Sequence, residues 1–112
     1  MIVDDNAEMR ALIRSLLEGV AQEFFECSGG EAAVATFSVE RPDWTVMDVV
    51  MPGMDGLAAT RRIKAQFPEA RILIVTHHHN PKLRDSALEA GAAAFLSKEE
   101  LTRLESLITA DV

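Results

Sequence analysis

Three carboxylates, one hydroxyl and one amine stand at the C-terminal ends of short apolar segments. They belong to Asp4, Asp5, Asp48, Thr76 and Lys98. A short apolar segment bounded by turn-forming residues is typical of a buried strand. Because ligands bind at the C-terminal edge of an open parallel sheet, we expect these five side chains to converge on one crevice there.

The chemistry of such a crevice follows from its charges. Three neighbouring carboxylates repel one another strongly in a partly dry site. Lys98 supplies one compensating positive charge, and a hard divalent cation such as Mg2+ would supply two more. A carboxylate beside such a cation can act as a nucleophile toward phosphorus, while the metal shields it and holds the phosphoryl oxygens. Thr76 and Lys98 could each bind one of those oxygens.

Each of these residues, taken singly, also has an ordinary structural explanation. Asp48 suits a turn because its side chain forms local hydrogen bonds, and Asp4 and Asp5 suit a helix N-terminus. Thr76 could be a common strand residue, and Lys98 a common surface residue. Their joint occurrence at strand ends favours the site over the separate explanations.

Alternating strands and helices must position these side chains. Strands are predicted over residues 2–3, 21–27, 44–48, 71–76 and 93–97, and each is followed by a predicted helix. This alternation predicts an α/β protein, with a five-stranded parallel sheet and helices on both of its faces. Right-handed crossovers make the flavodoxin-like (βα)5 arrangement, with strand order 2-1-3-4-5, the natural topology.

Local patterns predict how the helices begin and pack. Asn6 is the predicted N-cap of the first helix, and Ser28 with Glu31 is a predicted capping box for the second. Phe24 and Phe25 are adjacent, so one should face each side of the sheet. The apolar positions predicted to face inward from the first and fourth helices are Met9, Leu12, Ile13, Leu16, Leu17, Leu83, Ala87 and Leu88.

Composition restricts the class of protein. The chain has 112 residues, 48% of them hydrophobic, which suits one globular domain over residues 1–112. The net charge of −7 argues against nucleic-acid binding, because phosphate contacts need a basic surface. No apolar run approaches the ~20 residues of a membrane span, and we expect no signal peptide. The single Cys27 fits a reducing compartment, so we expect a cytoplasmic location.

Several motifs resemble those of the receiver domains of two-component response regulators. They are Val3-Asp4-Asp5-Asn6, Asp48-Val49-Val50-Met51-Pro52-Gly53-Met54-Asp55-Gly56, Val75-Thr76, Gly91-Ala92 and Phe95-Leu96-Ser97-Lys98. The resemblance extends over essentially the whole chain. The spacings of 28 residues from Asp48 to Thr76 and 22 from Thr76 to Lys98 also fit the family. The resemblance implies a phosphoacceptor switch, not an enzyme in the ordinary sense, that takes a phosphoryl group from a sensor histidine kinase or phosphotransfer protein.

The resemblance also implies which residues hold the phosphoryl group and the metal. Asp48 matches the phosphoacceptor. Asp5 and Asp48 match the direct Mg2+ ligands, with the backbone carbonyl of Val50 as a third. Asp4 matches the acid that holds the metal through water.

The same resemblance implies how the signal leaves the site. Thr76 and Lys98 match the switch hydroxyl and the lysine of the family, and Phe95 matches its switch aromatic, which rotates inward after phosphorylation. The fourth helix, fifth strand and fifth helix would form the interaction face and could support a homodimer. The ending Lys98-Glu99-Glu100-Leu101 looks most like receivers ahead of helix-turn-helix output domains, although we expect no output domain within residues 1–112.

Two departures from the family pattern give further expectations. Glu99 stands where many members have a cis-bonded proline, so we expect a trans bond here. His77 stands where the family usually has a small residue, and we hypothesise that its imidazole partly covers the site and slows small phosphodonors. The run His77-His78-His79 could also bind a transition metal, but consecutive residues do not easily point at one metal, so we favour a solvated loop.

Three other functional classes stay open on the sequence alone. A haloacid-dehalogenase-type phosphatase also uses Asp, Mg2+, Thr and Lys, but it needs a general acid where this chain has Val50. A flavin-binding electron carrier would want a hydroxyl- and glycine-rich phosphate loop in place of Asp4-Asp5-Asn6. A receiver-like interaction domain that works without phosphorylation would not need the complete acidic site.

Overall fold

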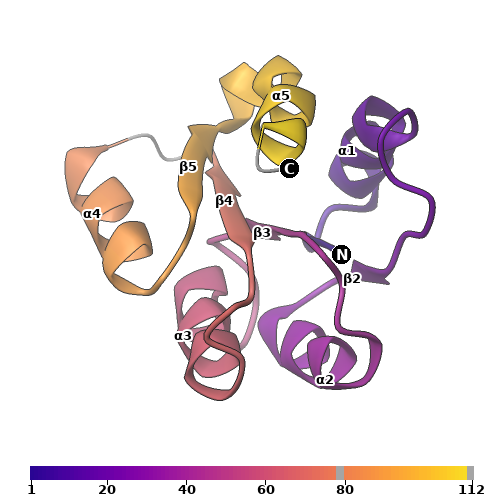
Figure 1. The fold of residues 1–112 in the computed structure, drawn as a ribbon. Coiled ribbons are helices and arrows are strands. Elements are labelled where there is room, and N and C mark those ends of the chain that lie inside the picture. The colour runs from indigo at the N-terminus through magenta and orange to yellow at the C-terminus, as the bar shows by residue number, and fades with distance from the viewer. Residues whose placement is uncertain (78–79, 111–112) are drawn as a thin grey trace.

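A computed structural model describes residues 1–77 and 80–110. Its five strands form one parallel sheet in the order β2-β1-β3-β4-β5 (Figure 1), which confirms the predicted flavodoxin-like topology. The strands are β1 (Ile2–Val3), β2 (Glu26–Cys27), β3 (Thr45–Asp48), β4 (Ile72–Thr76) and β5 (Ala94–Ser97). The helices are α1 (Ala7–Leu17), α2 (Gly30–Glu40), α3 (Gly56–Gln66), α4 (Pro81–Glu89), the 3-10 helix η1 (Lys98–Arg103) and α5 (Leu104–Thr109).

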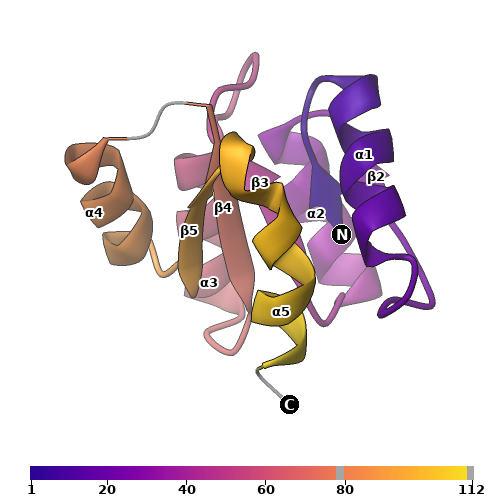
Figure 2. The same ribbon diagram turned by 90° about the horizontal axis from the view of Figure 1, so that it is seen from above.

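Helices lie on both faces of the sheet (Figures 1 and 2), and the sheet separates two apolar cores. The α2–α3–α4 core contains Phe37, Ile63 and Ala87, together with alternate residues of the strands. The α1–α5 core lies on the opposite face and contains Ile13 and Leu104. Helices therefore cover both faces, as predicted, and the C-terminal edge of the strands is left for a site.

The strand β2 is shorter than predicted. Residues 21–25 lie outside it, because β1 offers only Ile2 and Val3 as partners, paired with Glu26 and Cys27. Phe24 nevertheless packs against the α1–α5 core and Phe25 against the α2–α3–α4 core. The prediction that these two rings face opposite sides of the sheet is confirmed.

The N-cap of α1 agrees with the sequence prediction, whereas that of α2 does not. Asn6 caps α1 as predicted, its Oδ1 accepting from the Met9 N–H at 3.0 Å. The predicted capping box of Ser28 and Glu31 is wrong, because Gly29 is the N-cap of α2 and no side chain caps it. Glu31 instead accepts a hydrogen bond from the Met54 N–H at 3.0 Å and so tethers the loop between β3 and α3.

A capping box that the sequence reading missed lies at the end of β5. The Ser97 hydroxyl accepts from the Glu99 N–H at 3.2 Å, and Glu100 accepts from the Ser97 N–H at 3.3 Å. The 3-10 helix η1 therefore begins directly after the strand, which places Lys98 at the sheet edge. The described residues contain no cis peptide bond, so the expected trans bond before Glu99 is confirmed.

Two leucines predicted to face inward are exposed. Leu12 is 46% and Leu88 43% exposed, whereas Ile13 and Ala87 are buried. Leu12 lies at the edge of the apolar stripe of α1, and Leu88 at the edge of that of α4. Only the residues at the centre of each stripe are buried. Within the described residues, every helix is too short or too polar to span a bilayer.

Candidate functional site

The strand register brings the predicted residues to one edge. Val3 pairs with Met47, so Asp4 and Asp48 follow side by side on neighbouring strands. Asp48 pairs with Val75, and Thr76 pairs with Ser97, which places Thr76 and Lys98 on the far side of Asp48. A shallow pocket at this edge is lined by Asp4, Asp5, Asn6, Met9, Asp48, Val50, Thr76, His77 and Lys98.

The pocket concentrates negative charge around one lysine. Oxygen atoms of Asp4, Asp5 and Asp48 all lie within 4.8 Å of one another. Asp4 is 1% and Asp48 6% exposed, whereas Asp5 is exposed to solvent. Lys98 Nζ lies 2.8 Å from Asp4 Oδ2 and 3.4 Å from Asp48 Oδ2. One cation thus serves two buried acids.

The surroundings of Asp48 raise its pKa. Burial raises the pKa of Asp48 above its ordinary value, and the nearby charge of Asp4 raises it further. The Lys98 ammonium and the hydrogen bond from the Val49 N–H, 2.9 Å from Asp48 Oδ1, lower this pKa but do not cancel the rise. A further cation beside Asp48 would therefore be favourable. The candidate ligands Asp4, Asp5 and Asp48 all offer carboxylate oxygens, which suits a hard ion such as Mg2+.

The start of α3 leaves no room for a side chain above Asp48. A Cβ added to Gly56 would lie 1.9 Å from the Asp48 carbonyl oxygen. The Gly56 N–H donates to the Val49 carbonyl at 2.9 Å, so the loop returns tightly onto the strand end. Gly53, with φ of +76°, makes the turn within that loop. Glycine at these positions keeps the Asp48 loop compact.

The rim of the pocket is partly apolar. Val50 is 58% exposed beside the acids, and Met9 lines the pocket from α1. His77 is exposed and also lines the pocket, which agrees with its expected place at the rim. His78 and His79 lie outside the described residues.

Phe95 does not reach the acidic pocket. It is half-buried and lines a separate groove between α4 and the segment formed by η1 and α5. Its ring also packs against the α2–α3–α4 core. The predicted switch aromatic therefore lies away from the acids, on the predicted interaction face.

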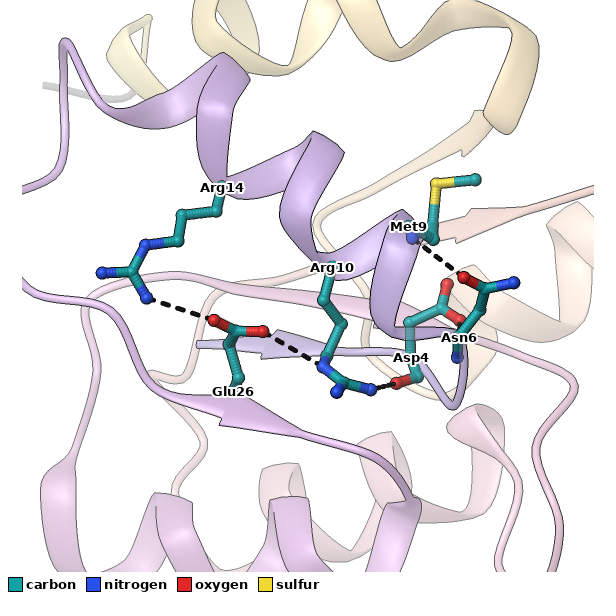
Figure 3. Close-up of polar contacts among 6 residues, drawn as sticks. All are labelled: Asp4, Asn6, Met9, Arg10, Arg14 and Glu26. Carbon is teal, nitrogen blue, oxygen red and sulfur yellow. Dashed lines mark hydrogen bonds and ion pairs between the residues drawn. The ribbon is translucent and has the colours of Figure 1, made fainter.

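Arg10 belongs to the surroundings of the site, although the sequence analysis did not single it out. Its Nη1 donates to the backbone carbonyl of Asp4 at 2.7 Å (Figure 3). Asp4 Oδ1 also accepts from the Asn6 N–H at 2.9 Å. The only signal in the sequence is an arginine one helical turn after the N-cap Asn6, and such a position alone does not reveal a contact to a loop carbonyl.

Comparison with known proteins identifies relatives over most of the chain. The family model of the response regulator receiver domain matches residues 1–109. Response regulator UvrY of Escherichia coli (strain K12) is 38% identical over 100 residues, which cover 88% of this chain and 46% of UvrY. Chemotaxis protein CheY of Bacillus subtilis (strain 168) is 35% identical over 99 residues, covering 88% of this chain and 82% of CheY. The chain thus spans about half the length of UvrY.

Solved structures give the same result. A two-component response regulator of the LuxR family from Aurantimonas sp. SI85-9A1 matches with a TM-score of 0.88 and 32% identity, covering 98% of this chain and 84% of that one. The receiver domain of NtrX from Brucella abortus matches with a TM-score of 0.86 and 27% identity, covering 98% and 94%. With the family model, the relatives above 30% identity and the sheet order in agreement, the chain belongs to the response regulator receiver domain family.

Proposed function

We propose that this receiver domain is a phosphoacceptor switch in which Asp48 takes a phosphoryl group from a phosphohistidine. The donor is a sensor histidine kinase or a phosphotransfer protein. The observation that carries the proposal is the buried Asp48 carboxylate, which shares Lys98 with a second buried acid. A carboxylate oxygen of Asp48 attacks phosphorus, the bond from phosphorus to the donor imidazole nitrogen breaks, and that nitrogen takes up a proton.

We propose Mg2+ as the cofactor of this step. Asp5, Asp48 and the backbone carbonyl of Val50 would hold the ion directly, and Asp4 would hold it through water. The proposal is supported by three carboxylates whose oxygens lie within 4.8 Å, in a site with one compensating lysine. The bound ion would supply positive charge opposite the acids and the phosphoryl oxygens. Asp5→Ala should therefore weaken Mg2+ binding, and an unchanged affinity in a titration would remove Asp5 from the ligand set.

The switch would work through the strands that carry Thr76 and Lys98. A phosphoryl group on Asp48 adds about −1.5 to −2 of charge. Lys98 would pair with one phosphoryl oxygen, and the Thr76 hydroxyl would donate to another. Their movement would bias Phe95 and the groove that it lines between α4, β5 and α5, where a partner or a second copy would dock.

We further propose that residues 1–112 act as one receiver unit in the cytoplasm. Its reaction is the transfer and later hydrolysis of its own phosphoryl group, so it is not an enzyme in the ordinary sense. The net charge of −7 supports protein partners over nucleic acid for this chain.

Intact mass after incubation with Mg2+ and acetyl phosphate tests the function. The wild-type domain should gain one phosphoryl group, and Asp48→Asn should gain none. Asp85→Asn is a matched control, because it removes one exposed carboxylate on α4 and makes the same change in net charge. A domain that stays unmodified with acetyl phosphate and with a phosphohistidine donor would instead be an interaction module that works without phosphorylation.

A further inference from the structure

The peptide bond between Asp4 and Asp5 is held by a side chain from outside the pocket. Arg10 Nη1 donates to the Asp4 carbonyl at 2.7 Å, and Arg10 Nε donates to Glu26 Oε1 at 3.1 Å (Figure 3). The guanidinium therefore links the β1–α1 loop to β2. Only 19% of the Arg10 side chain is exposed, so this bridge is much less solvated than an ordinary surface pair.

The two acids on either side of this peptide differ in how they are held. Asp4 has its own anchors, because Oδ1 accepts from the Asn6 N–H and Oδ2 pairs with Lys98. In the described part of the chain, the Asp5 carboxylate has no hydrogen bond or ion pair. A peptide unit is planar, so a bond that fixes the Asp4 carbonyl also fixes the amide and Cα of Asp5. Arg10 thus restrains the backbone from which the Asp5 side chain extends.

The other end of the bridge is anchored as well. Glu26 Oε2 accepts from Arg14 Nη1 at 3.1 Å, and the Arg14 guanidinium lies 4.7 Å from the centre of the Phe24 ring. Glu26 belongs to β2 and is paired with Ile2 of β1. Arg10 is therefore held by Glu26, which the sheet and Arg14 hold in turn. Arg14 itself does not touch the acidic loop.

We propose that Arg10 is a positioning residue that orients Asp5 for Mg2+ by fixing the Asp4–Asp5 peptide. The inference rests on the proposed Mg2+ site and adds the residue that sets its affinity. Two simpler roles for Arg10 would change the Mg2+ affinity differently when Arg10 is replaced. If Arg10 only lowered the negative potential of the pocket, its removal would tighten Mg2+ binding, because the ion would meet less opposing charge. If Arg10 only stabilised the fold, the affinity of the folded domain would not change.

A direct Mg2+ titration of Arg10→Met and Arg14→Met separates these roles. The two variants lose the same charge from the same helix, but only Arg10 contacts the Asp4 carbonyl. Removing a residue that holds a metal ligand in place typically lowers metal affinity by about 10- to 100-fold. Arg10→Met should therefore bind Mg2+ roughly tenfold more weakly. The Mg2+ affinity of Arg14→Met should stay within about twofold of wild type. Any long-range effect of the lost positive charge would make this affinity slightly higher. Thermal unfolding without Mg2+ checks that each variant is folded.

A second readout does not depend on the metal. The Asn6 N–H is bonded to Asp4 Oδ1, so loosening of this loop should speed its hydrogen exchange in Arg10→Met and not in Arg14→Met. Equal or tighter Mg2+ binding by Arg10→Met, or an equal loss in Arg14→Met, would overturn the positioning role. Failure of wild type to bind Mg2+ would refute the proposed metal site itself. If Arg10→Met does not fold, Arg10→Gln is judged by the same criteria.

Discussion

Replacing Asp48 with asparagine should stabilise the fold at neutral pH while removing the phosphoacceptor. Burial and the Asp4 charge raise the pKa of Asp48, so the folded state disfavours the ionised carboxylate. Asparagine has nearly the same shape, and its Oδ1 can still accept the Val49 N–H now bonded at 2.9 Å. Lys98 keeps its shorter contact with Asp4, at 2.8 Å.

The size of the effect can be worked from the distances. With an effective dielectric constant of about 20, attraction between Asp48 and Lys98 at 3.4 Å is roughly 5 kcal/mol. Repulsion from the buried Asp4, whose nearest oxygen lies within 4.8 Å, is roughly 3.5 kcal/mol, which offsets most of that attraction. Burial of the charge costs a few kcal/mol more, part of which the buried amide would retain. We expect Asp48→Asn to gain roughly 1–3 kcal/mol, or about 4 °C in Tm per kcal/mol.

The pH dependence gives this prediction its sign. A carboxylate whose folded pKa is raised destabilises the fold at any pH where the unfolded chain would ionise it, because folding then binds a proton or buries the charge. The difference between Asp48→Asn and wild type should therefore be small below the ordinary pKa of 3.8, grow as pH rises from that value to the raised folded pKa, and stay constant above it. Mg2+ should stabilise wild type and narrow the difference at neutral pH.

Chemical unfolding of wild type, Asp48→Asn and the exposed control Asp85→Asn between pH 3.5 and 8 measures these differences. A less stable Asp48→Asn at pH 7 would refute the reasoning. So would a gain that is the same at every pH, or one that Asp85→Asn shares.

Three further changes probe other parts of the site. Lys98→Ala should leave two buried acids without their cation and cost roughly 3–5 kcal/mol, and the phosphorylated variant should still form but dimerise or bind its partner poorly; full switching would show that Lys98 is not the link. His77→Ala should speed phosphorylation by acetyl phosphate several-fold at saturating Mg2+ without changing Mg2+ affinity, and equal rates would remove the proposed gate. Gly56→Ala should cost about 1–3 kcal/mol in denaturant unfolding, since its Cβ would meet the Asp48 carbonyl at 1.9 Å; wild-type stability would show that the loop can relax.

The sequence predicts the strand order and the edge of the sheet where the site lies, because both follow from short-range patterns. Alternating strands and helices allow few topologies, and Asp48, Thr76 and Lys98 each end a strand, so the parallel register brings them together. The length of β2 was not predictable from its own residues. It depends on how much of β1 is available for pairing.

Contacts between distant segments account for most of what sequence reasoning missed. Glu31 suits a capping box by composition, but it bonds to Met54, which is 23 residues away. Arg10 bonds to Glu26, which is 16 residues away, and the same guanidinium reaches the Asp4 carbonyl. The exposed Leu12 and Leu88 could not be predicted from the sequence either. The spacing of apolar residues shows which face of a helix points inward, but not how many residues of that face are buried.

The division of the interior into two cores has a consequence for how such domains diverge in evolution. In β4, Ile74 points into the α2–α3–α4 core and Val75 into the α1–α5 core. Substitutions on opposite faces share few neighbours, so their effects on stability should be nearly additive. Natural selection can then reshape α1 and α5 for one partner while the packing of α2 and α3 drifts separately, provided that the strand ends keep their register around Asp48.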